Sequence, residues 1–333
     1  MTTLLELKEK IMRFYGKNEA YALPVIRFVI ALMTFILINA NIGYMESLSS
    51  VPVSLILALV CSILPMNVTV LIAGVLMMAH FYALSLEVCL VAFVLLILLY
   101  LIYFRFSPKC GYNVLLLPIC YRFHIPYIMP ACAGLLQGVA SVFSVVCGTL
   151  VFFFVKGIHE NATTLGESVE GTDNIMSKLV ATLNQFLSNK EMYLVTAILG
   201  AATIIVYLIR RMEIDYSWRI AWISGISFQG IGLIAGYMML GMADKILSVV
   251  IGCIISAVIA FVVEFVFCAL DYTRVERLQF EDDEYYYYVK AVPKALIAQQ
   301  QRNVKRFSGS DASEKMSKRK FAEEMDIDEE LLD

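Results

Sequence analysis

The 333-residue chain is 60% hydrophobic and only 17% charged, and its mean hydropathy is +0.75. Soluble domains carry nearer ~25% charged residues, so the composition excludes an ordinary soluble protein. The net charge of −3 and the close mixing of basic with acidic residues also exclude a nucleic-acid-binding face. Apolar segments fill most of residues 24–270, and ~20 apolar residues in a helix cross a bilayer. The sequence predicts an all-α polytopic membrane protein whose first partner is the lipid bilayer.

The N-terminal segment, residues 1–22, alternates apolar with charged positions. This alternation is typical of a short amphipathic helix on the membrane surface, and a solvated leader is the alternative. The apolar run that follows extends to Ile42 and is longer than the ~7–15 apolar residues of a signal peptide. We therefore expect a cytoplasmic leader and then a helix that remains in the membrane as an anchor.

The transmembrane domain is predicted at residues 23–270, with about eight transmembrane helices of membrane-crossing length. Their approximate ranges are 23–42, 51–64, 66–84, 87–105, 131–155, 191–210, 218–241 and 246–270. The second range is short and meets the third at Pro65, so a tight hairpin and a pair of half-helices both remain open.

A further apolar segment, residues 113–130, is interrupted by three prolines, Pro118, Pro126 and Pro130. Proline removes a backbone donor, and unsatisfied backbone groups are not tolerated against lipid. We therefore predict a proline-interrupted re-entrant or interfacial segment that packs against the rest of the protein.

Lysines and arginines in short loops indicate which way the chain is oriented. With the N-terminus inside, the inner side holds Lys8, Lys10, Arg13, Lys17, Arg105, Lys109, Arg122, Arg210, Arg211 and Arg219. The outer side holds fewer: Lys156, Lys178, Lys190 and Lys245. This bias predicts a multi-pass protein of the cell membrane with both termini in the cytoplasm. The outer loop is then about 156–190, and residues 174–188 within it have helical apolar spacing.

Two stretches of the sequence are built alike: each has a short apolar run that ends in a proline, followed by an alanine–glycine pair in a longer apolar segment. In the first stretch these parts are residues 61–65 and 73–76, and in the second they are residues 120–126 and 133–136. Repeats with interrupted helices are typical of transporters with a midplane site. Apolar sequences resemble one another easily, so it remains open whether residues 51–84 and residues 113–155 are two copies of one structural unit.

Ionisable and amide side chains within the apolar block are candidates for function, because burying them in a bilayer is costly. Glu264 pairs with Arg27, Arg210 or Arg211 in one interpretation, and takes up a proton in another. Arg122 and His124 either face the cytoplasm or bind an anionic ligand or lipid headgroup. We list the binding or gating candidates as Glu264, Gln137, Gln229, Arg122 and His124.

Two glycine pairs have the GxxxG spacing that lets helices approach closely. They are Gly134 with Gly138, and Gly232 with Gly236. The spacing predicts helix packing with the neighbouring glutamines hydrogen-bonded across the contacts. The alternative is a substrate path lined by Gln137, Gln229 and Glu264.

Motifs of catalysis and metal binding are missing from the sequence. It contains no GxxxxGK[ST], HExxH or GxSxG motif. Its eight cysteines lack zinc-site spacing and mostly fall in apolar segments, where we expect free buried thiols. We expect no enzyme activity, no metal and no cofactor.

Residues 271–333 form a charged tail that we expect to be cytoplasmic, partly extended and partly disordered. Consecutive tyrosines favour a strand, at Tyr285, Tyr286, Tyr287 and Tyr288. A lone strand is unstable, so it must pair with another chain or with this one. A protein partner docked by strand addition is one interpretation, and interfacial tyrosines are the other.

Two functions fit these features. The first is a transporter or permease-like subunit of the cell membrane for an unknown solute. The second is a non-catalytic scaffold or assembly component of an envelope complex, which recruits partners through its tail. A homo-oligomer remains open in either case.

Overall fold

The computed structural model describes residues 8, 10, 16–163, 172–212, 214, 216–267, 276–281 and 286–291. The chain divides into two compact units, Met1–Cys268 and Ala269–Asp333. Most of the predicted leader before residue 16 lies outside the described residues, and so does the tail after residue 291.

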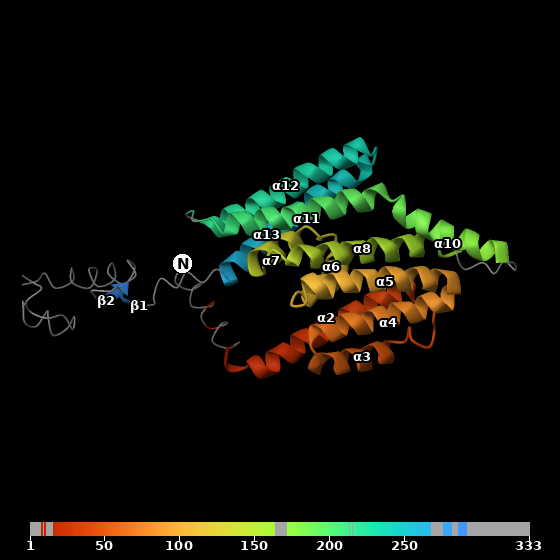
Figure 1. Ribbon diagram of the computed structural model, residues 1–333, viewed down its shortest axis with the longest axis horizontal. Helices are drawn as coiled ribbons and strands as arrows, with labels where there is room; N and C mark the ends of the chain where they lie inside the picture. The colour runs from red at the N-terminus through yellow and green to blue at the C-terminus, as the bar shows by residue number, and fades with distance from the viewer. Residues whose placement is uncertain are drawn as a thin grey trace, which may run out of the picture. The chain divides into compact units, whose positions relative to one another are not determined.

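The first unit is helical throughout its described part (Figure 1). Its helices are α2 (Glu19–Ile42), α3 (Val51–Ile63), α4 (Met66–Leu84), α5 (Leu86–Phe106), α6 (Gly111–Arg122), α7 (Ile128–Leu136), α8 (Ser141–Glu160), α10 (Thr172–Leu187), α11 (Lys190–Arg210), α12 (Ser217–Met239) and α13 (Ile246–Phe267), with a 3-10 turn η1 (Ala243–Lys245) before α13. The helix expected near 174–188 is present as α10.

Seven helices of the described residues are long and apolar enough to cross a membrane: α2, α4, α5, α8, α11, α12 and α13. The chain is therefore a multi-pass membrane protein. Of the roughly eight expected helices, seven have this length. The other, α3, forms where it was predicted and returns the chain from the end of α2 to the start of α4, but its 13 residues, or ~20 Å, are shorter than the ~30 Å hydrocarbon core.

The span predicted at 131–155 is wrong in its outline, because this stretch forms two helices. Helix α7 ends at Leu136 and α8 begins at Ser141. Gln137 between them has an extended backbone, with φ −122° and ψ −176°. Its side chain is held by Asn113, which keeps this residue out of a continuous helix.

The helices lie side by side around two apolar cores (Figure 1). The first core is built mainly from α2, α4 and α5, and the second from α7, α11, α12 and α13. Helix α6 packs against α2, α4 and α8, whereas α7 packs against α11, α12 and α13. The α6–α7 hairpin, residues 111–136, therefore joins the two halves of the bundle.

The bundle has two ends, which we call the hairpin end (64–67, 107–111, 137–141 and 211–212) and the α10 end (43–50, 84–86, 172–189 and 240–245) (Figure 1). At the hairpin end, Tyr103 Oη donates to Asn67 Oδ1 at 2.7 Å. Near the α10 end, buried His80 accepts from the Met45 N–H at 3.2 Å and donates through Nε2 to Asn39 Oδ1 at 2.8 Å. These bonds tie the connections to the helices beneath them.

The second unit contains two antiparallel strands, β1 (Glu276–Glu281) and β2 (Tyr286–Ala291). The strand predicted at the tyrosines is present, and it pairs with this chain, with Tyr288 opposite Gln279. Tyr286, Tyr287 and Tyr288 lie in β2, and Tyr285 lies outside the described residues.

The two glycines of the first GxxxG pair provide a matched test of the packing. A Cβ on Gly134 would lie 2.7 Å from Val206 Cβ and 3.0 Å from the Thr203 carbonyl oxygen of α11. Gly138, in the α7–α8 connection, has nothing within 4 Å of that position. We expect Gly134→Ala to cost about 1–3 kcal/mol of stability through overpacking, and Gly138→Ala to cost little. Thermal unfolding of the purified variants in one detergent measures both, and equal effects would contradict this packing.

Candidate functional site

The start of α6 and the end of α7 are joined by a pair of amide side chains. Asn113 Nδ2 donates to Gln137 Oε1 at 2.7 Å, and Gln137 Nε2 donates back to Asn113 Oδ1 at 3.2 Å. Asn113 Nδ2 also donates to Ser144 Oγ of α8 at 2.8 Å. Because this contact links residues near both ends of the hairpin, α6 and α7 leave and return to the same end of the bundle.

The C-terminus of α7 is capped by an arginine of α11. Arg210 Nη1 lies 3.5 Å from the Gly134 carbonyl oxygen and 3.3 Å from that of Gln137. The last carbonyls of a helix lack partners within the helix and favour a nearby cation. The Arg210 guanidinium also lies 4.9 Å from the centre of the Trp218 ring, which fixes its orientation.

The turn of the hairpin holds a histidine in a strained conformation. The Ile125 N–H donates to the Cys120 carbonyl at 2.9 Å and the His124 N–H to that of Tyr121 at 3.1 Å, which is the Schellman arrangement. His124 has φ 58°, in the left-handed region where glycine is usual. A residue with a Cβ pays roughly 1–2 kcal/mol there.

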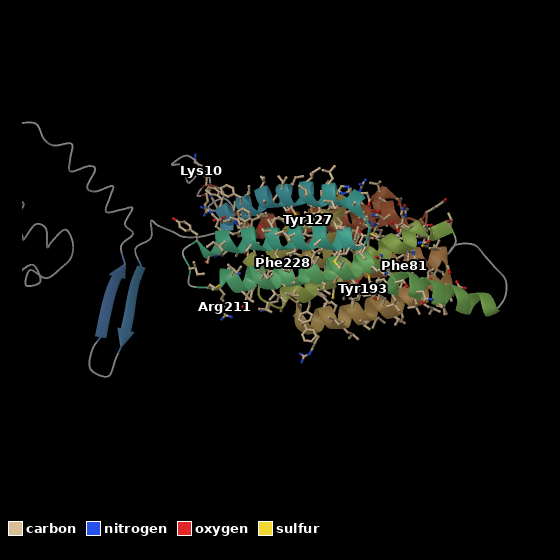
Figure 2. The ribbon with its side chains drawn as sticks, turned by 90° about the horizontal axis from the view of Figure 1, so that it is seen from above. Lys10, Phe81, Tyr127, Tyr193, Arg211 and Phe228 are labelled. Carbon is tan, nitrogen blue, oxygen red and sulfur yellow. The ribbon has the colours of Figure 1, made fainter. Side chains whose placement is uncertain are left out.

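The turn lies inside the length of the bundle. Figure 2 shows Tyr127 between the levels of Arg211 at one end and Phe81 towards the other. Gln229 of α12 is fully buried and donates through Nε2 to the Tyr127 carbonyl oxygen at 2.7 Å. This bond anchors the turn to α12.

A cavity of about 280 Å³ lies between α2, α4, α6 and α8. It extends from Val114 in the first turn of α6 to Asn41 and His159 in the last turns of α2 and α8. Its walls are mostly apolar. Of the residues that the structure describes, no aspartate or glutamate lines the cavity, and four basic residues do: Arg122, His124, Lys156 and His159.

The charges of the cavity are poorly compensated by the protein. Among the described residues, the Arg122 guanidinium makes no ion pair and no side-chain hydrogen bond. Lys156 Nζ lies 3.8 Å from Glu160 Oε1, between side chains that are 38% and 59% exposed, and such exposed pairs are weak. The cavity therefore presents positive charge without an acidic partner inside it.

Arg122 and His124 were the predicted candidates that the structure places in this cavity. Helix α6 carries Arg122 to the turn of the hairpin, and its assignment to the inner side of the membrane stays a prediction. The sequence analysis did not single out Lys156 and His159. These two residues are three positions apart near the end of a predicted span, which places them on one face of a helix. That spacing could have identified them as a basic pair.

Glu264 lies outside the cavity lining, on α13. Its carboxylate accepts from Arg219 Nε at 3.2 Å and from Trp222 Nε1 at 2.8 Å, both on α12. The expected partners were Arg27, Arg210 and Arg211, and this part of the interpretation is wrong. Arg27 instead lies 3.4 Å from the Leu64 carbonyl oxygen.

The other candidates lie elsewhere than the cavity lining. Gln137 and Gln229 hold the hairpin, and Gln229 Oε1 has no hydrogen-bond partner among the residues that the structure describes. Gly232 and Gly236 of α12 face Ile198 and Leu194 of α11. The two prolines of the suspected repeat occupy different places, because Pro65 precedes α4 at the hairpin end and Pro126 lies in the hairpin turn.

Among the described residues, no group of three or more His, Cys, Asp or Glu side chains is placed to hold a metal ion. The cysteines described there are free thiols. Comparison of the chain with models of known families, with curated proteins and with solved structures finds no match. The case for a function therefore rests on the geometry and charge of this chain's own residues.

Two adjacent arginines test the support of the hairpin. Arg210→Gln removes the charge that caps α7, so we expect it to lower stability by about 1–3 kcal/mol and to speed amide exchange in residues 128–140. Arg211, which is exposed and donates only to Tyr207 Oη at 3.1 Å, is the control, and Arg211→Gln should change neither. Hydrogen exchange and thermal unfolding measure the difference, and indistinguishable variants would contradict the capping role.

Proposed function

We propose that the chain is a transporter or permease-like subunit of the cell membrane, and that the cavity between α2, α4, α6 and α8 is its solute site. The cavity is the observation that carries the proposal. It combines apolar walls with a few convergent polar groups, which is the usual composition of small-molecule sites. The proposal assigns no chemical reaction to the chain.

The α6–α7 hairpin supports this proposal because it acts as a re-entrant segment. Helices broken at membrane depth are tolerated where they are buried in protein or line a cavity, and transporters place such breaks at their substrate sites. Here the turn is covered by Gln229 on one side, and it delivers Arg122 and His124 to the cavity on the other.

The loop charges support a cytoplasmic placement of the hairpin end. Basic residues near this end are Arg105, Lys109, Arg210, Arg211 and Arg219, and those near the α10 end are Lys156, Lys190 and Lys245. Because α2 begins and α13 ends towards the hairpin end, the proposal puts both termini in the cytoplasm. The cavity then extends towards the outer face of the membrane.

The energy source is not a P-loop of this chain, because its sequence lacks that motif. The proposed subunit therefore either lets its solute equilibrate, or couples to an ion gradient, or works with a separate ATPase. Only the last of these requires a protein partner.

A scaffold function is the second candidate, and the β1–β2 pair favours it. Two strands alone are marginally stable, and each leaves an edge of unpaired backbone groups that another strand can cover. In this alternative the tail recruits an envelope protein by strand addition, and the cavity has no solute.

The transport proposal is tested by screening solutes against the purified full-length protein. A bound solute raises the unfolding temperature, and we expect at least one class to do so for the wild type but not for Arg122→Gln. That solute should then enter proteoliposomes faster with the wild-type protein than with the variant. Lys109→Gln, which removes an exposed charge outside the cavity, should behave as wild type.

A protein that moves none of the stabilising solutes would contradict transport. Deleting residues 276–333 separates the two candidates. The scaffold predicts that the deletion abolishes recovery of stoichiometric envelope partners from native membranes, while the transporter predicts that solute entry survives it.

A further inference from the structure

We infer that the ligand of this cavity is a small amphipathic anion: one carboxylate or phosphate group on a short apolar body. This inference rests on the proposed solute site and names the class of molecule that the site takes. It is carried by three features of the cavity, namely its charge, its size and the strained histidine at its wall.

The charge requires an anion. Arg122, His124, Lys156 and His159 line one cavity, and no acidic residue within the described part of the chain lines it with them. The Arg122 and His124 side chains are exposed at the cavity, and a guanidinium pairs best with a carboxylate or phosphate, which accept paired hydrogen bonds from it. The protein supplies Arg122 with no such acceptor among the described residues, so the acceptor belongs to the ligand.

The walls and the volume limit the rest of the molecule. Val70, Ala73, Met77 and Leu115 are among the apolar residues that line the cavity, and they favour an apolar body. The volume of about 280 Å³ lies at the lower edge of the ~300–1,000 Å³ that small-molecule sites occupy. An inorganic ion leaves the apolar part empty, and a whole phospholipid does not fit within it.

His124 adds an independent sign of a ligand. It lies at a backbone position that favours glycine, with φ 58°, and no side-chain hydrogen bond within the described residues accounts for it. Strain of this kind persists at ligand sites where the side chain is needed. The imidazole lines the same cavity as Arg122, where it donates to the anion.

The inference is tested with radiolabelled octanoate. Equilibrium dialysis is done against the full-length protein in nanodiscs of zwitterionic lipid, with empty nanodiscs subtracted. We expect saturable binding that octyl phosphate displaces and that 1-octanol and octylamine do not. Arg122→Gln should weaken binding roughly tenfold or more, because it removes a charge-assisted hydrogen bond, and Lys156→Gln should weaken it less.

Two further variants keep the test independent of misfolding. Val155→Trp keeps every charge but fills the space beside α8, and it should abolish binding. Lys109→Gln removes a basic residue outside the cavity and should leave binding unchanged. Octanoate that binds Arg122→Gln as tightly as wild type, or 1-octanol that competes equally, would overturn the inference.

His124→Gly tests the strained turn. Glycine relieves the left-handed backbone, so without ligand we expect the unfolding temperature to rise by roughly 2 °C or more. Octanoate affinity should fall in the same variant, because the imidazole donor is gone. A variant with unchanged affinity would remove His124 from the site.

The anion has two sources, the bilayer or water, and competition distinguishes them. Hexadecanoate partitions into lipid and hexanoate stays mainly in water, so stronger competition by the first indicates entry from the bilayer, and comparable competition indicates entry from water. Both results support an amphipathic anion.

Different results would contradict the inferred ligand class and the proposed transport function. Octanoate that binds through Arg122 but does not enter proteoliposomes keeps the ligand class and contradicts transport. A different solute that is transported, together with no octanoate binding, keeps transport and overturns the ligand class.

Discussion

The pairing of Asn113 with Gln137 is the interaction on which the rest of this structure depends. Two hydrogen bonds between their amides, at 2.7 and 3.2 Å, close a segment that would otherwise be long enough to cross the membrane. Amide pairs satisfy each other's donors and acceptors, so they cost little to place within an apolar protein. Arg210 then caps the exit of α7, and Gln229 anchors the turn. Together they allow irregular backbone inside the bundle without leaving its polar groups unpaired.

The position of the cavity follows from this constraint. Because the hairpin turns back inside the bundle, α6 ends part of the way along its neighbours and leaves space beside α2, α4 and α8. The turn brings Arg122 and His124 to that space, and α8 adds Lys156 and His159. The four basic residues therefore line one cavity because α6 ends at Arg122. Glu264 of α13 forms an ion pair with Arg219 and accepts a hydrogen bond from Trp222 away from this space, so it does not offset the cluster.

The sequence predicted much of the architecture, because apolar run length reports directly on membrane-crossing helices. Six of the expected spans are present close to their predicted bounds, a seventh is present as the differently bounded α8, and the strand at the tyrosines is present as β2. The break after Leu136 was missed because residues 131–155 are mostly apolar, and the hydrogen bonds by which distant Asn113 holds Gln137 outside the helix cannot be read from the sequence. The partner of Glu264 was misassigned for the same reason, since charge counting cannot tell which arginine faces it. The prolines did indicate that 113–130 is irregular, but not how deeply its turn lies.

The measurement that tests this account most directly is the sidedness of the two ends of the hairpin. Lys109→Cys and Val139→Cys, both exposed in the wild type, are made one at a time in a variant without native cysteines. They are labelled with a membrane-impermeant maleimide in right-side-out and inside-out vesicles, with Lys190→Cys marking the opposite end. The account predicts that positions 109 and 139 react from the same side and position 190 from the other. Reaction of 109 and 139 from opposite sides would mean that α6 and α7 together cross the membrane, and it would contradict both the hairpin and the cavity built on it.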